Sequence, residues 1–154
     1  MWNRDWSKQT YLMYAKTRPS GMDTAVTSEP DGISKMCLSC HDGIIAPATY
    51  GNHSRAAAYV FSQNVMGTVP SSDHPISFVY DTALANRKRD LYDPSTKLSS
   101  LPGRTGTITA DMLFQNRMEC SSCHDVHNTK AVPGTKLLVK DNAGSALCLT
   151  CHNK

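Results

Sequence analysis

The sequence lacks a long apolar run, and it is poor in the large side chains that build a conventional hydrophobic core. Its 154 residues include only three Phe and two Trp, and hydrophobic residues make up 40% of the chain. Because a run of about 18 apolar residues is absent, a transmembrane helix is not expected. The length corresponds to one domain, and the composition offers little side-chain material for a core.

Several functional motifs are absent as well. The chain contains no GxSxG, no HExxH and no P-loop, so it lacks the usual signatures of hydrolases, zinc proteases and nucleotide-binding enzymes. The net charge is only +3, and the single basic cluster, Arg87 to Arg89, is short. This charge pattern predicts no nucleic-acid binding, and the cluster fits a solvated loop.

All six cysteines belong to three copies of the pattern Cys-x-x-Cys-His, which is the attachment signature of a c-type haem. In such a motif the two thiols bind the porphyrin edge covalently, and the histidine is the proximal ligand of the iron. The sequence therefore predicts three c-type haems. The residues that would hold them are Cys37, Cys40, His41, Cys120, Cys123, His124, Cys148, Cys151 and His152.

Two other uses of the cysteines remain open alternatives. The four cysteines of the second and third motifs could form a zinc site, because paired Cys-x-x-Cys knuckles are the usual source of one. That arrangement leaves Cys37 and Cys40 without partners and the three trailing histidines unexplained. A redox-active dithiol is the second alternative, but the chain shows no thioredoxin-like context. Haem is favoured over both.

Three histidines lie outside the motifs, and three irons need three sixth ligands. His53, His74 and His127 therefore complete a predicted set of bis-His haems. His127 is not expected to share an iron with His124, because opposed imidazoles hold their Cα atoms roughly 12 Å apart and three residues span at most about 10 Å. His127 should bind a different haem. Methionine is the rival sixth ligand, from Met66 or Met112.

Asp42 and Asp125 each follow the histidine of a motif. A short acidic side chain in this position commonly accepts a hydrogen bond from its own loop. We expect this structural role for both. With a sixth ligand for every iron, the sequence predicts no catalytic residue and no enzyme activity.

The predicted fold consists mostly of irregular loops with short α-helices and little β-structure, wrapped around haems that supply the core. Residues 1–32 form a haem-free N-terminal arm, and residues 33–154 form a single trihaem domain. The aromatic residues of the arm are spaced as on one side of a helix: Trp2, Trp6, Tyr11 and Tyr14. The arm either packs on its own haem surface or docks onto a neighbouring subunit.

Within the domain, the segment HPISFVYD at residues 74–81 is expected to be extended, and the Ala-rich residues 56–60 to form a short helix. Residues 81–106, which contain Pro94, Pro102 and two glycines, are typical of a surface connection. Residues 142–145 are expected to cap a short helix leading into Cys148.

The segments CLSCHDG, HPISFVYD, MECSSCHDVHN and NAGSALCLTCHNK resemble the small multihaem cytochromes c secreted by bacteria that respire on metals or extracellular acceptors. The resemblance covers roughly residues 33–154. It implies electron transfer, with His74 and His127 as sixth ligands and His53 less directly so.

Some relatives in this group polymerise into extracellular filaments whose haems stack across subunits, and others are soluble shuttles. The resemblance favours a filament subunit, a homopolymer joined through haem-containing interfaces, which exchanges electrons with redox proteins or extracellular acceptors. A soluble periplasmic or extracellular shuttle is the alternative, and a haem-dependent reductase is a more distant one.

The location follows from the chemistry of attachment, because covalent c-type haem is attached outside the cytoplasm. The first residues, MWNRDWSKQT, contain no apolar segment of a signal peptide. We therefore expect the numbering to begin in the mature chain. The predicted location is extracellular or at the cell surface, otherwise periplasmic.

Overall fold

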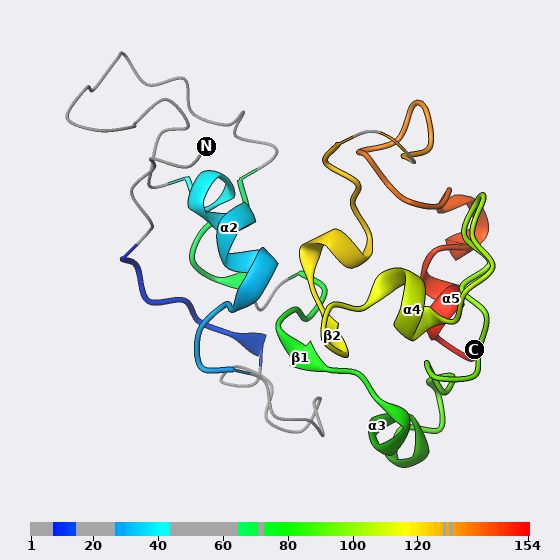
Figure 1. Cartoon of the computed structure of the whole chain (residues 1–154). Coiled ribbons are helices and arrows are strands. Elements are labelled where there is room, and N and C mark those ends of the chain that lie inside the picture. The colour runs from blue at the N-terminus through cyan, green and yellow to red at the C-terminus, as the bar shows by residue number, and fades with distance from the viewer. Residues whose placement is uncertain (1–7, 15–26, 44–64, 71–72, 128, 130) are drawn as a thin grey trace. The chain divides into compact units, whose positions relative to one another are not determined.

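A computed structural model describes residues 8–14, 27–43, 65–70, 73–127, 129 and 131–154 of the chain (Figure 1). The backbone forms two compact units. The first contains Met1–Met22 and Val26–Pro75, and the second contains Asp23–Ala25 and Ile76–Lys154. The division into an arm of residues 1–32 and a trihaem domain of residues 33–154 stays a prediction.

The described residues contain little regular secondary structure, as the sequence predicts, and most of them lie in loops and turns (Figure 1). The elements in chain order are α2 (Gly32–His41), β1 (Phe78–Val79), α3 (Thr82–Arg87), α4 (Ile108–Met112), β2 (Arg117–Met118), η3 (Cys120–Ser122), η4 (Ala143–Ser145) and α5 (Cys148–Cys151). Of the helices that the structure describes, none has the length and apolar character needed to cross a membrane. His53, Trp2, Trp6 and the Ala-rich segment lie outside the described residues.

Helix α2 is the main element of the first unit. The Asp31 carboxylate caps its N-terminus by accepting a hydrogen bond of 2.7 Å from the Gly32 N–H. Leu38 is fully buried and anchors the helix. The chain leaves α2 through Gly43 at a φ of +74°, where an added Cβ would lie 2.7 Å from a methyl carbon of Val65. Both the dihedral and the close approach favour glycine at this turn.

The arm is not helical over residues 8–13, so this part of the helix prediction is wrong. The Tyr11 N–H donates to Glu29 Oε2 at 3.0 Å, and the Leu12 N–H donates to the Thr68 carbonyl at 2.9 Å. These donors serve distant partners instead of the carbonyls four residues earlier. Because Tyr11 and Met13 are each only 2% exposed, this part of the arm packs inside the first unit.

In the second unit, β1 and β2 pair antiparallel, with Phe78 opposite Met118 and Val79 opposite Arg117. The strand β1 lies within the segment 74–81, which the sequence predicts to be extended. The buried core residues of this unit include Phe78 in β1, Met118 in β2, Tyr80 just after β1, and Ile108 and Met112 in α4.

Residues 81–106 are more ordered than the predicted surface connection. Asp81 caps helix α3 by accepting a hydrogen bond of 2.8 Å from the Leu84 N–H, and Leu84 and Ala85 are buried. The sequence contains this helix-start signal, an Asp at position 81 three residues before Leu84. The prolines and glycines that follow instead favour a loop.

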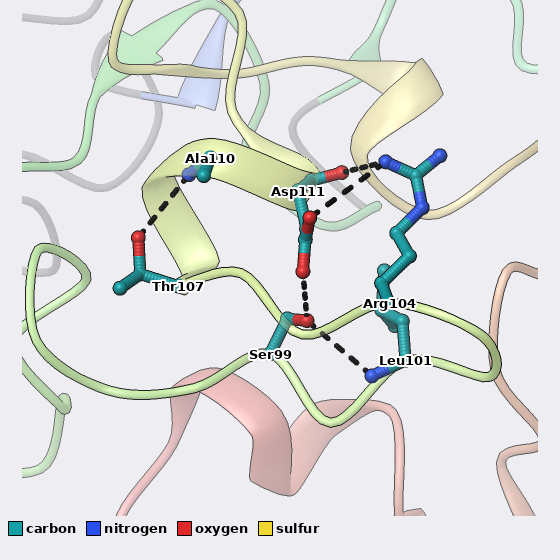
Figure 2. Close-up of polar contacts among 6 residues, drawn as sticks. All are labelled: Ser99, Leu101, Arg104, Thr107, Ala110 and Asp111. Atoms are coloured by element: carbon teal, nitrogen blue, oxygen red, sulfur yellow. Dashed lines mark hydrogen bonds and ion pairs between the residues drawn. The ribbon is translucent and has the colours of Figure 1, made fainter.

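A network of polar contacts closes the loop that follows, as Figure 2 shows. The buried Ser99 hydroxyl donates to Asp111 Oδ2 and accepts from the Leu101 N–H at 3.3 Å. Arg104 Nη1 donates to the Asp111 carbonyl at 3.2 Å. These contacts fix the loop to Asp111 of α4, so it is an integral part of the second unit.

Asp93 provides a test of this region by pH. Its Oδ1 accepts from the Ser95 N–H at 2.9 Å, from the Ser95 hydroxyl at 2.8 Å and from the Thr82 hydroxyl at 2.8 Å. The bonds from Ser95, the backbone bond first, lower the pKa of Asp93 below its ordinary value of 3.8. A lowered pKa contributes stability that is present above the unfolded value and is lost as the pH falls through the folded value.

We therefore expect the free energy of unfolding of the wild-type protein to decrease as the pH falls below about 4. Asp93→Asn should remove part of that decrease. Urea denaturation followed by circular dichroism, from about pH 6 to pH 3, measures both curves. Parallel curves for the two proteins would contradict the assignment.

Candidate haem sites

The first motif lies on the last turns of α2, and His41 is its final residue. Cys37 and Cys40 are three residues apart, so a helical backbone places both sulfurs on one side. The His41 carbonyl accepts a hydrogen bond of 2.7 Å from the Met66 N–H. The end of the motif is therefore held by a segment that is distant in sequence.

Asp42 follows this motif and is buried, with 2% of its surface exposed. Its Oδ2 accepts a hydrogen bond of 2.9 Å from the Tyr11 hydroxyl, 31 residues away. The sequence predicts a bond within the loop, whereas this bond joins the motif to the arm. No local pattern signals such a partner, because the residues meet only when the unit folds.

The second motif begins in the short helix η3. Its N-cap is Glu119, and a capping box joins Glu119 with Ser122, whose hydroxyl accepts from the Glu119 N–H at 2.9 Å. The His124 N–H donates to the Cys120 carbonyl at 3.1 Å. Since residues i and i+3 of a 3₁₀ turn are eclipsed, Cys120 and Cys123 lie on the same side.

Glu119 is a buried carboxylate that the sequence analysis missed, with 3% of its surface exposed. Ser77 donates from its hydroxyl to Glu119 Oε2 at 3.3 Å, and Arg117 Nε lies 3.8 Å from Oε1. Arg117 also donates to the Ser77 carbonyl at 3.0 Å. The residues around β1 and β2 thus fix the position of the residue that precedes Cys120.

The ring of His124 is oriented by the backbone. Its Nδ1 donates to the Lys136 carbonyl at 2.8 Å, and His124 forms an antiparallel bridge with Leu138. The neighbouring Cys123 carbonyl accepts from the Val139 N–H at 3.0 Å. With Nδ1 as the donor, the lone pair of the neutral ring lies on Nε2, the atom that would bind iron.

The two described histidines outside the motifs are both exposed. His74 Nδ1 donates to the Pro75 carbonyl at 2.8 Å, which again places the lone pair on Nε2. The His127 N–H donates to Asp125 Oδ1 at 3.1 Å, so the predicted loop bond of Asp125 is confirmed. Among the residues that the structure describes, no three side chains of His, Cys, Asp or Glu gather as a metal site. The assignment of sixth ligands stays a prediction.

The third motif is helix α5 with His152 as its C-cap. The His152 N–H donates to the Cys148 carbonyl at 3.0 Å, as the corresponding histidine does in the second motif. The N-cap of α5 is Leu147, not a residue of 142–145, and its side chain makes no cap bond. The Asn142 side chain accepts a hydrogen bond of 3.2 Å from the N–H of Leu147, the N-cap of α5.

Side chains and backbone from earlier in the chain surround this motif. The Cys151 carbonyl accepts from the Tyr92 N–H at 2.9 Å and from the Tyr80 hydroxyl at 3.4 Å. Burial, and next the Cys151 thiol, raise the pKa of Tyr80 far above its usual value. Lys140 Nζ donates to the Thr150 hydroxyl at 2.9 Å. No local pattern in the sequence indicates these contacts, since they join residues ten or more positions apart.

The thiols of the second and third motifs lie within electrostatic reach of one another. Burial raises the pKa of Cys123 to about 11, with further contributions from Cys148 and Cys120. Burial raises the pKa of Cys151 to about 12, with Cys123 as the next cause. Although these thiols are near one another, no three of the described His, Cys, Asp or Glu side chains are grouped as metal ligands, so the structure offers no support for the zinc alternative.

The surroundings of the motifs fit a large apolar group. All six cysteines are free of disulfides. Exposed apolar side chains lie beside or within each motif: Met36 before the first, Val126 and Leu137 beside the second, and Leu149 inside the third. A flat porphyrin attached to the neighbouring sulfurs would cover such surface, and that burial is favourable. The residues present therefore fit covalent haem.

Residues 113–154 match the protein family described as the doubled CXXCH motif. The matched span contains the second and third motifs, and the first motif at Cys37 lies outside it. No curated protein matches the chain. The family match supports a c-type cytochrome-like protein, in which Cys-x-x-Cys-His motifs bind haem covalently for electron transfer.

A double-mutant cycle tests the bond between the arm and the first motif. We expect Tyr11→Phe and Asp42→Asn each to destabilise the first unit, because a buried hydrogen bond to a carboxylate contributes about 1.5–3 kcal/mol. The double variant should cost less than the sum of the single ones. Native-state hydrogen exchange of residues 32–42 measures the effect. Additive changes would show that the two side chains do not interact.

Proposed function

We propose that the chain is an electron-transfer protein with three covalent c-type haems, each ligated by two histidines. The observation that carries this proposal is that three Cys-x-x-Cys-His motifs contain all six cysteines and that three histidines, one for each motif, remain outside them. When bound, haem supplies an iron that accepts and releases one electron reversibly.

The histidines divide into two groups under this proposal. His41, His124 and His152 are the proximal ligands, and His53, His74 and His127 are the sixth ligands. Hydrogen bonds from Nδ1 to backbone carbonyls support the role of His124 and His74, because they orient the ring and leave the lone pair on Nε2. A full set of ligands leaves no iron open to a substrate, so the proposed protein is not an enzyme.

The proposed assembly is a secreted filament, in which copies of this chain meet at haem-containing interfaces and pass electrons to redox partners or extracellular acceptors. Three motifs in 154 residues and the resemblance to secreted multihaem cytochromes support it. A soluble periplasmic or extracellular shuttle is the alternative assembly. A haem-dependent reductase requires an iron that lacks one of these ligands.

Denaturing mass spectrometry of the purified protein tests the haem count. The expected mass exceeds that of the chain by three haems, because thioether bonds survive denaturation. The double variant Cys37→Ser/Cys40→Ser should lose one haem, and Met36→Leu, beside the same motif, should lose none. A colourless protein without added mass would contradict the proposal.

The ligand set is checked on the same sample by absorption and electron paramagnetic resonance. Low-spin signals for all haems are expected from bis-His ligation. A far-red band of a methionine–iron bond would assign a sixth ligand to Met66 or Met112 instead. High-spin iron that binds carbon monoxide in the wild-type protein would favour the reductase.

Negative-stain electron microscopy of the native red protein distinguishes the assemblies. Uniform filaments are expected if haem-containing interfaces join the copies. Dispersed particles of monomer size would contradict the filament and favour the shuttle. Haem content should be equal in the two cases, so the assembly and the electron-transfer chemistry are tested separately.

A further inference from the structure

The loop after the second motif is held by the side chain of Asp125. One carboxylate oxygen accepts from the His127 N–H at 3.1 Å, and the other accepts from the Thr129 hydroxyl at 2.9 Å. The exposed residues Val126 and His127 lie between these bonds. The carboxylate therefore holds the backbone N–H of His127 and the side chain of Thr129, which follows it.

Asp125 is itself held by a turn at residues 132–138, here termed the brace. Its ends meet where the Val132 N–H donates to the Leu138 carbonyl at 2.7 Å. Within the brace, the Thr135 hydroxyl donates to the Val132 carbonyl at 2.7 Å and accepts from the Leu138 N–H at 3.0 Å. The Leu137 carbonyl accepts from the Asp125 N–H at 2.8 Å.

The same brace orients His124, whose Nδ1 donates to the Lys136 carbonyl. Adjacent carbonyls of one turn thus hold a proximal ligand and the residue that restrains a second histidine. His124 and His127 are three residues apart and cannot readily share an iron. Under the proposed ligand set, the brace and Asp125 would therefore hold ligands of two different irons on one piece of backbone.

We propose that Asp125 is a positioning residue, which prepares His127 to bind iron as a sixth ligand; this rests on the ligand set of the proposed function. The carboxylate orders the loop when the chain folds, so little backbone freedom is lost when the imidazole binds. A residue without an acceptor at position 125 releases the loop, and His127 then dissociates from its iron more often.

Carbon monoxide binding to the reduced holoprotein tests this role, because the gas binds only an iron whose sixth position is open. We expect His127→Ala to open one iron. Asp125→Ala should raise the fraction of iron that binds the gas about tenfold over the wild type, the factor that corresponds to one lost hydrogen bond. Asp125→Asn keeps one acceptor oxygen, so its fraction of gas-binding iron should lie between those of the wild type and Asp125→Ala.

Asp93→Ala is the matched control. Like Asp125, Asp93 accepts one hydrogen bond from the backbone N–H two residues later and one from a threonine hydroxyl. In the Asp93 turn that N–H belongs to Ser95, whereas in the Asp125 turn it belongs to His127. This variant loses the same kind of turn and should bind no more carbon monoxide than the wild type. An increase equal to that of Asp125→Ala would overturn the positioning role, because loss of any such turn would then suffice.

The remaining outcomes distinguish failure of the positioning role from failure of the ligand assignment. If His127→Ala opens an iron but both Asp125 variants match the wild type, Asp125 does not position His127, while the ligand set stands. If His127→Ala opens no iron, His127 is not a sixth ligand, and the positioning role falls with that part of the proposed function. If mass spectrometry shows that Asp125→Ala has lost haem, Asp125→Asn provides the test of the positioning role. A fraction of gas-binding iron in Asp125→Asn equal to that of the wild type would then overturn the role.

Discussion

Each Cys-x-x-Cys-His motif must hold two sulfurs and one imidazole on a single helical turn, and the rest of the described structure depends on that requirement. A turn of this length is not stable alone, because helix nucleation costs more than one hydrogen bond returns. In the second and third motifs the histidine N–H closes the turn on the first cysteine carbonyl. Residues that are distant in sequence supply the remaining stability, so the loops between the motifs have a structural role.

The external supports differ from motif to motif. The residue after the histidine of each motif illustrates this: Asp42 bonds Tyr11 of the arm, Asp125 bonds its own loop, and the Asn153 N–H donates to the Asp90 carbonyl at 2.8 Å. The local turn repeats, whereas its surroundings do not. This agrees with a sequence in which only the five-residue motif recurs, and it allows each site to have its own solvent exposure and charge.

The sequence predicts the parts of the site that are local and misses those that are not. The motif turns and the loop bond of Asp125 follow from neighbouring residues. The acceptor of the His124 ring cannot be predicted in this way. It is the backbone carbonyl of Lys136, and since every residue has a carbonyl, no residue type marks the one that is used. The aromatic spacing of the arm predicts a helix, but Tyr11 and Leu12 use their N–H groups for distant acceptors. Hydrogen bonds to distant residues thus take the place of the helix that the aromatic spacing predicts.

The chemistry of the acceptors bears on how the proposed electron carrier sets its potentials. A carboxylate bonded to Nδ1 raises the basicity of a ligating histidine, whereas a carbonyl orients the ring with a smaller electronic effect. At His124 and His74 the acceptor is a carbonyl, and the nearby carboxylate of Asp125 bonds the His127 backbone instead of an imidazole. These bonds to carbonyls orient the two rings. Under the proposed function, burial and nearby charge, such as that of Lys140 beside the third motif, would contribute to differences in potential between the haems.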